Sequence, residues 1–348
     1  MMKVIRSFAA SGIEDAPAMV DATMAAPIAG VQDVVVNVVA VSVNPVDTKL
    51  RQNVTDPAGK VFGYDAVGTI AQVGQDVTDF KVGDRVFYAG TTKRDGANAE
   101  QQVVDARLIA KAPATLSDAE AAAMPLTSLS AGEVLFEKMG FLFGEGANEG
   151  RELLIVNGAG GVGSMAIQLA KWAGLTVTAT ASRPETIAWV KQLGADRVFN
   201  HREDLIAQAK AAAVDAFDGI LILHSTDQYF AAAAQLVTAF GHVASIVENV
   251  SPLPMGLLKN KAASFDWEYM FAKSDYAVDM AGQGVLLADI AKLVDAGVIK
   301  TTLTKTLADG INADSLRAAH QLVEANKMIG KVVVTGPFNG NVNDQGDK

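Results

Sequence analysis

The pattern of hydrophobic and polar positions changes near residue 126. Before it, short valine-rich segments such as VQDVVVNVVAVSV, AVGTIAQVG and VGDRVFY are bounded by Gly, Asp or Pro, and few windows have helical spacing. β-Branched residues between turn residues are typical of short strands. Residues 1–125 are therefore predicted to form a β-rich, barrel-like region.

From residue 153 onward, strand-like and helix-like segments alternate. The strand-like segments are LLIVNG, TVTATAS, RVFN, GILILHS and HVASIV, and between them lie SMAIQLAKWAG, PETIAWVKQLG, EDLIAQAKAAA and DQYFAAAAQLVTAFG. Apolar residues recur at helical spacing in SMAIQLAKWAG, and PETIAWVKQLG has a proline placed to begin a helix and a glycine placed to end it. This strict alternation predicts a parallel sheet with helices on both faces.

After about residue 272 the alternation loosens. VLLADIAKLVDAG predicts a helix, and KVVVTG predicts a late strand that returns to the first region. The expected fold class is thus α/β, with a β-rich region interrupted by a doubly wound parallel sheet. The length of 348 residues also favours two domains over one.

Composition excludes several classes of function. The net charge of −10 argues against nucleic acid or an anionic membrane surface as the main partner, since both need basic patches. The absence of cysteine excludes disulfides, thiolate metal sites and a cysteine nucleophile. The start MMKVIRSFAASG lacks a signal-peptide core and no stretch is long enough for a membrane span, so a cytoplasmic location is expected by default.

A glycine cluster follows the first predicted strand of the alternating region. Gly158, Gly160 and Gly163 form G-x-G-x-x-G, with Gly161 and Val162 between the last two, at the start of a predicted helix. In that context the first glycine permits a tight turn, the second admits a pyrophosphate and the third lets helix and strand pack closely. The helix N-terminus would offer N–H groups to the phosphates. The segment predicts dinucleotide binding; the alternative is a glycine-rich turn without a ligand.

The next strand ends without the acidic residue that binds the ribose hydroxyls of NAD. Ser182 and Arg183 stand there instead. A hydroxyl and a guanidinium suit a 2′-phosphate, which a carboxylate would repel, so NADPH is predicted over NADH. The alternative is that Ser182 only caps the helix begun by Pro184 and that Arg183 is solvated. His201, after the third strand, either borders the same adenosine pocket or is incidental.

These segments together resemble the medium-chain dehydrogenase/reductase superfamily, more closely its quinone oxidoreductase branch and the group named zinc-type alcohol dehydrogenase-like proteins. The resemblance covers nearly the whole chain and rests on AVSVNPVDTKLRQ, FGYDAVGTIAQVGQDV, FKVGDRVFYAG, AAAMPLTSLSAGEVLF, NGAGGVGSMAIQLAK, TASRPETIAWVKQLGAD, DWEYMF and LVDAGVIKTTL. It implies a GroES-like β-barrel catalytic domain at 1–125 and 273–348, interrupted by a doubly wound Rossmann NADPH-binding domain at 126–272.

The chain departs from the zinc enzymes of that superfamily. The positions that match the catalytic zinc ligands hold Asn44, Tyr64 and Leu126, and TTKRDGANAEQQ has no cysteine for a structural zinc. The four histidines are scattered, so a zinc-free protein is predicted. Without a strong Lewis acid to ionise an alcohol, reduction of an activated acceptor is favoured. The predicted substrate is a small molecule, a quinone or an α,β-unsaturated carbonyl, with the cofactor supplying the hydride.

The resemblance also implies site residues in the β-rich domain. Asn44 and Asp47 match positions that line the nicotinamide cleft, and Tyr64 could donate a hydrogen bond to the acceptor oxygen. The alternative for Tyr64 is a packed aromatic ring. Asp47 and Asp65 could instead be structural hydrogen-bond anchors. The sequence forces no dedicated proton donor, so bulk water can protonate the product.

Thr127 and Ser130 open the helix that leads into the cofactor domain. They resemble residues that contact the nicotinamide or ribose, with helix capping as the alternative. A different class of function also stays open, namely a dinucleotide-binding redox sensor or regulatory protein with little turnover.

The segment ASFDWEYMF predicts how the protein assembles. It alternates aromatic residues on one side of a strand at the open edge of the parallel sheet: Phe265, Trp267, Tyr269 and Phe271. Exposed apolar edges invite pairing with another chain. A homodimer through the cofactor domain is therefore predicted, as the resemblance also implies; the alternative is that a helix of the same chain covers the strand.

Overall fold

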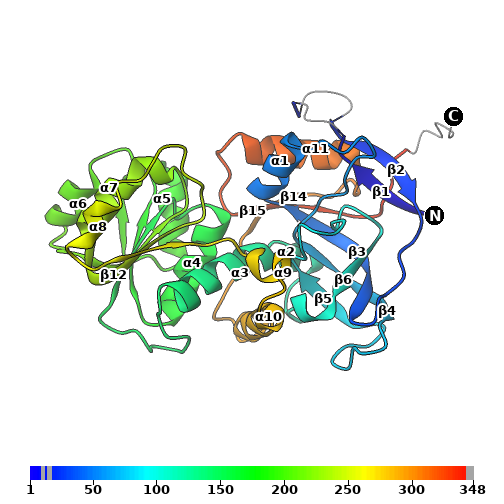
Figure 1. Cartoon of the computed structure of the whole chain (residues 1–348), viewed down its shortest axis with the longest axis horizontal. Helices are drawn as coiled ribbons and strands as arrows, with labels where there is room; N and C mark the ends of the chain where they lie inside the picture. Colours follow the sequence, from blue (N-terminus) through cyan, green and yellow to red (C-terminus); the bar gives the residue numbers. More distant parts are fainter. Residues whose placement is uncertain (9–11, 14–17, 342–348) are drawn as a thin grey trace. The chain divides into compact units, whose positions relative to one another are not determined.

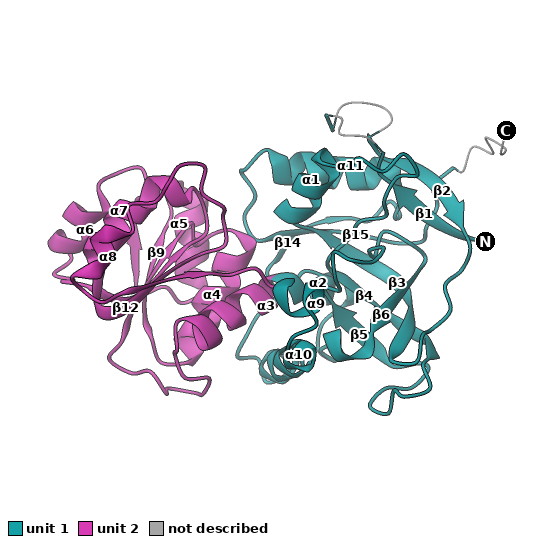
Figure 2. Ribbon diagram, in the orientation of Figure 1, with its two compact units in different colours: residues 1–126, 271–348 teal, residues 127–270 magenta. Residues whose placement is uncertain are grey.

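The computed structural model describes residues 1–8, 12–13 and 18–341, and the chain divides into two compact units (Figures 1 and 2). Unit 1 comprises residues 1–126 and 271–348, and unit 2 comprises residues 127–270. The boundaries expected from the sequence, after residues 125 and 272, differ from these by one and two residues. The first unit is thus built from two separated parts of the chain.

The main sheet of unit 1 has the strand order β14-β15-β3-β4-β5-β7, and β6 also pairs with β3. Its strands are β3 (Asp33–Val43), β4 (Ala66–Val73), β5 (Arg85–Tyr88), β6 (Gln101–Asp105), β7 (Ile109–Lys111), β14 (Leu303–Leu307) and β15 (Lys331–Thr335). The long strand β3 pairs with β6 through its first half and with β15 through its second half. A separate antiparallel pair is formed by β1 (Met2–Arg6) and β2 (Val20–Met24).

Valines that the sequence pattern assigned to strands fill the core of unit 1. Val34, Val36, Val41 and Val334 are among its buried members. The described residues of this unit form the helices α1 (Pro45–Gln52), the short η2 (Ala106–Leu108), α2 (Asp118–Ala122), α9 (Ala272–Asp275), α10 (Met280–Asp295) and α11 (Ala313–Glu324). The β-rich character of the region is confirmed, although it contains more helices than its pattern indicated.

Unit 2 is a parallel six-stranded sheet with the order β10-β9-β8-β11-β12-β13. The strands are β8 (Glu152–Val156), β9 (Thr176–Thr180), β10 (Arg197–Phe199), β11 (Phe217–Ile222), β12 (Val237–Ser245) and β13 (Ser264–Trp267). Every neighbouring pair in this sheet is parallel, so the predicted doubly wound arrangement is confirmed. The order reverses at β8, which lies between β9 and β11.

The helices of unit 2 connect these strands. They are α4 (Gly161–Trp172), α5 (Pro184–Gln192), α6 (Leu205–Ala211), α7 (Thr226–Leu236) and α8 (Gly256–Lys259). Trp189 Nε1 on α5 donates to Ser164 Oγ on α4 over 2.8 Å, so these two helices share one face of the sheet. Right-handed crossovers place α6 and α7 on the opposite face. The helix expected over DQYFAAAAQLVTAFG ends earlier, at Leu236, and TAFG belongs to β12.

A further helix, α3 (Pro125–Gly132), begins in the last residues of unit 1 and continues into unit 2, where it runs directly into the π-helix η3 (Glu133–Lys138). Among the described residues, no helix combines the length and the apolar character that a membrane span requires.

Candidate active site

Gly158 and Gly160 lie between β8 and α4, and Gly163 lies in the first turn of α4. A Cβ at Gly158 would lie 2.8 Å from Ala179 Cβ, and one at Gly163 would lie 2.6 Å from Gly158 O, so packing within the protein excludes both. A Cβ at Gly160 would meet nothing closer than 3.4 Å, at Asn157 Nδ2. The chain's own packing leaves room at Gly160, as close approach of a ligand to the backbone requires.

The N-terminus of α4 adjoins this open position. Gly160 is its N-cap, in an extended conformation, and no side chain in the described part of the protein caps the helix. The backbone N–H groups of Gly161 and Val162 lie in the first turn, where no intrahelical acceptor exists. Exposed N–H groups and the positive end of the helix dipole form an anion site. These residues therefore fit the pyrophosphate of a dinucleotide.

Arg183, not Ser182, is the N-cap of α5. The Arg183 backbone N–H donates to Thr186 Oγ1 over 3.1 Å. The alternative that Ser182 only caps this helix is therefore wrong. Arg183 Nε lies 3.2 Å from Glu185 Oε1, with both side chains partly exposed. Ion pairs of that kind contribute little free energy, so a phosphate can compete for the guanidinium.

His201 belongs to a group of basic side chains at the carboxyl ends of three parallel strands. Burial lowers the pKa of His201, and the positive charges of Arg202, His224 and Arg183 lower it further. Arg183 follows β9, His201 and Arg202 follow β10, and His224 follows β11. Arg202 and His224 were not among the predicted site residues; they stand three residues after the end of β10 and two residues after the end of β11.

Thr127 and Ser130 are buried and lie inside α3, which begins at Pro125. They are therefore not N-caps of that helix, and the capping alternative is wrong. Their predicted contact with the nicotinamide or ribose stays a prediction.

In unit 1, Asn44 and Asp47 are part of a buried hydrogen-bond cluster. Asn44 immediately precedes α1, and its backbone N–H donates to Asp47 Oδ2 over 2.8 Å. The side-chain amide of Asn44 donates to Asp65 Oδ2, also over 2.8 Å. Burial raises the pKa of Asp47 to about 7. These bonds match the alternative in which Asp47 and Asp65 are structural anchors.

Lys331 completes this cluster. Its Nζ lies 2.9 Å from Asp65 Oδ2 and donates to Asn44 Oδ1, while Asp65 Oδ1 accepts the backbone N–H of Leu126 over 2.7 Å. Burial raises the pKa of Asp65, and the Lys331 charge opposes that shift. Lys331 was not among the predicted site residues, because a lysine at the start of a strand usually faces solvent.

The residues at the expected zinc position do not fit a zinc ion. Leu126 has no donor atom, and Asn44 Oδ1 already accepts from the Lys331 ammonium. A dication there would be repelled by a buried positive charge. In the described ranges, no group of three or more His, Cys, Asp or Glu residues is placed to hold a metal ion. The zinc-free state itself stays a prediction.

Tyr64 is fully buried and packs among aromatic rings. Its ring centroid lies 6.4 Å from that of Phe62 and 5.1 Å from that of Phe271, the latter edge to face. This packing matches the alternative interpretation of Tyr64, and its hydrogen bond to a substrate oxygen stays a prediction.

The aromatic segment at the end of unit 2 is not a single strand face. β13 ends at Trp267, and Phe271 belongs to unit 1. Phe265 packs edge to face on Phe230 of α7, at 5.5 Å between centroids. Trp267 and Tyr269 are 44% and 49% exposed. The expected alternation of four aromatics is therefore wrong, but two of them remain exposed at the edge of the sheet.

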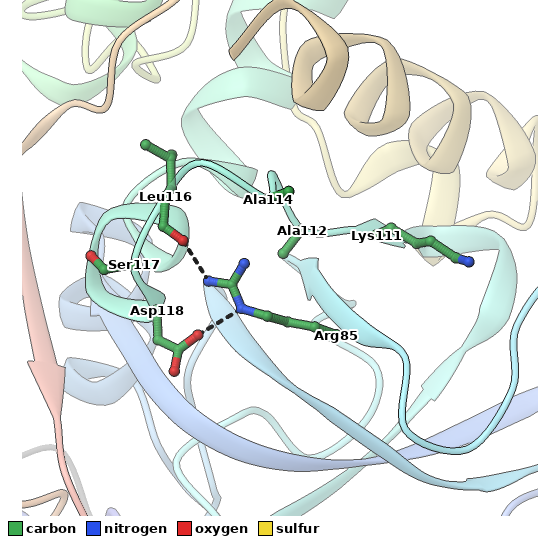
Figure 3. A pocket seen from close by; sticks show the side chains of 7 residues that line it. All are labelled: Arg85, Lys111, Ala112, Ala114, Leu116, Ser117 and Asp118. Atoms are coloured by element: carbon green, nitrogen blue, oxygen red, sulfur yellow. Dashed lines mark hydrogen bonds and ion pairs between the residues drawn. The ribbon is translucent and has the colours of Figure 1, made fainter. Parts of the chain in front are cut away.

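A surface pocket of about 610 Å³ lies elsewhere in unit 1 (Figure 3). The Arg85 guanidinium in this pocket donates to Asp118 Oδ1 over 2.7 Å and to the backbone oxygens of Pro113 and Leu116. Its positive charge is thus already compensated, and none of the predicted site residues lines the pocket.

Comparison with known proteins agrees with the two units. Residues 30–114 match the family model of the alcohol dehydrogenase GroES-like domain, and residues 161–259 match that of zinc-binding dehydrogenases. A zinc-type alcohol dehydrogenase-like protein of Staphylococcus aureus (strain MSSA476) is 43% identical over 303 residues, which cover 87% of this chain and 90% of that protein.

Two further proteins are similar over different lengths. A crystal structure from Rhizobium etli CFN 42, of a protein assigned to the zinc-dependent alcohol dehydrogenases, has 43% identity and a TM-score of 0.91, covering 96% of this chain and 98% of that one. The NADPH-dependent alkenal/one oxidoreductase of Arabidopsis thaliana is 38% identical over 200 residues, which are 54% of this chain and 50% of that protein.

The parallel sheet, its glycine loop and these matches define a dinucleotide-binding oxidoreductase. The chain belongs to the medium-chain dehydrogenase/reductase superfamily and, within it, to the zinc-type alcohol dehydrogenase-like proteins.

Proposed function

We propose that the protein is an NADPH-dependent reductase that transfers hydride to a quinone or an α,β-unsaturated carbonyl without zinc. The observation that carries this proposal is the basic group of Arg183, His201, Arg202 and His224, on the same sheet as the uncapped α4 N-terminus. Together they provide anion sites for both the pyrophosphate and a 2′-phosphate.

Cofactor choice follows from the position of these charges. With the pyrophosphate at Gly160–Val162, the adenosine lies toward β9 and β10, because a dinucleotide spans the point where the strand order reverses. The guanidinium of Arg183 then binds the 2′-phosphate, which also compensates the positive charges that lower the pKa of His201. NADH has no 2′-phosphate, so it cannot compensate the positive charges of these basic side chains.

The proposed class of hydride acceptor follows from the side chains at the expected zinc position in unit 1. Leu126 and the ammonium of Lys331 leave no zinc site that could ionise an alcohol. Quinones and enones are already electrophilic, so they need less activation. The alkenal/one activity named for the Arabidopsis relative supports the enone.

The chain's own residues bind and orient the reactants. When bound, NADPH supplies the hydride. The α4 N-terminus holds the phosphates, and Thr127 and Ser130 contact the nicotinamide or its ribose. The buried cluster of Asn44, Asp47 and Lys331 fixes the start of α1.

The test is a panel of quinones, enones, aldehydes and alcohols assayed with NADPH and with NADH. We expect NADPH-dependent reduction of quinones or enones and no oxidation of alcohols. Tight NADPH binding without turnover on any acceptor would favour the redox sensor, and zinc-dependent alcohol oxidation would contradict the proposal.

We also propose that two copies associate through β13. This strand ends the sheet, and Trp267 and Tyr269 expose apolar surface beside it. A second copy can extend the sheet across a two-fold axis and cover both rings.

A further inference from the structure

Asn157 begins the loop between β8 and α4 in a backbone conformation that favours glycine. It directly follows β8, and its φ of 69° lies in the left-handed region. Side chains are uncommon in this region, although asparagine tolerates it better than most residues. The glycine cluster starts only at the next residue, Gly158, so position 157 keeps a side chain. Non-glycine residues held in this conformation cluster at active sites and ligand-binding sites, which makes the Asn157 side chain a candidate for a role in binding.

The neighbouring strand β9 holds Asn157 in this conformation. The Asn157 backbone N–H donates to Thr180 Oγ1 over 2.8 Å, and the Gly158 N–H donates to Thr180 O over 3.1 Å. Thr180 is the last residue of β9 and is fully buried. The Gly160 N–H then donates to Asn157 O over 3.4 Å. These hydrogen bonds fix the backbone at Asn157, and with it the direction in which its side chain leaves the chain.

The side-chain amide of Asn157 lies at the open position of the loop. Its Nδ2 is the atom nearest to the place that a Cβ at Gly160 would take, 3.4 Å away. Gly160 is the N-cap of α4, so this amide stands at the same helix end as the backbone N–H groups of Gly161 and Val162. Within the described part of the chain, the Asn157 side-chain amide makes no hydrogen bond. A side-chain donor and backbone donors that meet without an acceptor are suited to an anion.

We propose that the Asn157 side-chain amide donates a hydrogen bond to the pyrophosphate of the bound dinucleotide. This inference rests on the dinucleotide site of the proposed function and adds a side-chain donor to the backbone donors of α4. The pyrophosphate oxygens are charged, so they accept a stronger hydrogen bond than a neutral group does. NADPH and NADH carry the same pyrophosphate. Asn157 therefore contributes equally to the binding of both dinucleotides, whereas Arg183 favours NADPH alone.

The experiment compares Asn157→Gly and Asn157→Asp with the unaltered protein by calorimetric titration with NADPH and with NADH. Glycine adopts the left-handed backbone without strain and removes only the side chain, while aspartate keeps the size and brings a negative charge toward the phosphates. We expect the dissociation constant of Asn157→Gly to rise about tenfold for both dinucleotides, because a hydrogen bond to a charged group contributes at least that factor. Asn157→Asp should lose more affinity than Asn157→Gly.

Two controls separate the amide from the shape of the loop. The nucleotide 2′-AMP carries adenosine and the 2′-phosphate but no pyrophosphate, so its dissociation constant should change less than about twofold in Asn157→Gly. Asn326→Gly alters an exposed asparagine of unit 1 that is also left-handed, with a φ of 53°, and should leave dinucleotide affinity unchanged. The melting temperature of ligand-free Asn157→Gly should stay close to that of the unaltered protein.

A dissociation constant of Asn157→Gly within about twofold of the unaltered value for both dinucleotides would overturn the proposal. An equal loss of 2′-AMP affinity would also overturn it, because it would indicate a distorted loop. If Asn157→Gly fails to fold, a crystal structure of the unaltered protein with NADP⁺ decides instead, and a pyrophosphate beyond hydrogen-bond reach of Asn157 Nδ2 would count against the contact. Unaltered protein that binds dinucleotides through Asn157 but reduces no acceptor would contradict the proposed reductase and leave this contact standing.

Discussion

Lys331 Nζ and Asp65 Oδ2 lie 2.9 Å apart, with side-chain exposures of 4% and 0%. Removing one member of such a pair leaves a buried charge without its partner. Lys331→Met should therefore lower the free energy of unfolding by about 3–5 kcal/mol. Urea denaturation measures this change.

Two further variants separate the effect of the buried ion pair from the effect of removing any lysine. Lys305→Met, on the exposed part of β14, should change stability by less than about 0.5 kcal/mol. The double variant Asp65→Asn/Lys331→Met should recover part of the loss, because no charge is left uncompensated. Equal losses in the Lys331 and Lys305 variants would show that the buried pair contributes nothing particular.

Purified protein should hold no stoichiometric zinc. The motivation is Asn44, Tyr64 and Leu126 at the ligand positions, with the Lys331 ammonium on Asn44 Oδ1. Elemental analysis and activity after treatment with a strong chelator check this expectation. One tightly held zinc per chain, or activity that is lost on chelation and restored by zinc, would refute it.

NADPH should bind at least about tenfold more tightly than NADH, because a charge-assisted contact contributes roughly 1.5–3 kcal/mol. Arg183→Ala should remove most of this preference and leave NADH affinity nearly unchanged. Fluorescence titration with both cofactors measures the effect. Arg107→Ala, which breaks the ion pair with Asp105 in unit 1, is the control. Equal affinities of the unaltered protein for both cofactors would disprove the assignment.

Because the pKa of Asp47 is raised from 3.8 to about 7 in the folded protein, this carboxyl group makes the free energy of unfolding depend on pH. Between these values the folded state binds the proton more tightly than the unfolded state, so this group's contribution to stability falls as pH rises from about 4 to 7. Asp47→Asn lacks that contribution. The free energy of unfolding of the variant, relative to the unaltered protein, should therefore increase across this range.

Chemical denaturation at several pH values measures that relative stability. Asp309→Asn, at an exposed position, is the control and should run parallel to the unaltered protein. A difference for Asp47→Asn that stays constant from pH 4 to pH 7 would contradict the pKa assignment.

Trp267→Glu should weaken the proposed dimer, because a carboxylate at the edge of the sheet would be desolvated in the interface. Light scattering at micromolar concentration measures the mass. Tyr276→Glu replaces a more exposed aromatic of unit 1, 79% against 44%, and should leave the mass unchanged. A monomeric unaltered protein would refute the proposed assembly.

The features predicted correctly from the sequence are those encoded within short segments. The strand–helix alternation and the turn at Gly158–Gly163 depend on neighbours along the chain, so both are visible as patterns. Capping was less predictable, because Ser182 and Thr186 are both plausible partners for the start of α5. In the structure the backbone N–H of Arg183 donates to the Thr186 hydroxyl, so Thr186 is the partner.

The buried charges were not predictable in this way. Glu133 and Glu268 are buried, although each looks like a solvent-facing residue in its own segment. Lys331, the first residue of β15, also looks like a solvent-facing residue in the sequence. Only the tertiary fold brings such residues to their partners, so a single sequence offers no local signal for them.

The division of the chain into a continuous and a discontinuous unit has a consequence for synthesis on the ribosome. Asp65 and Lys331 are separated by 266 positions, and β15 pairs with β3 from the far end of the chain. Unit 1 therefore lacks both its buried ammonium and this strand until nearly the whole polypeptide has emerged. Unit 2 is complete as soon as residue 270 has left the exit tunnel. Because domains fold as units during translation, we expect the parallel sheet of unit 2 to fold first. The N-terminal part of unit 1 can complete its fold only after its C-terminal strands have been synthesised.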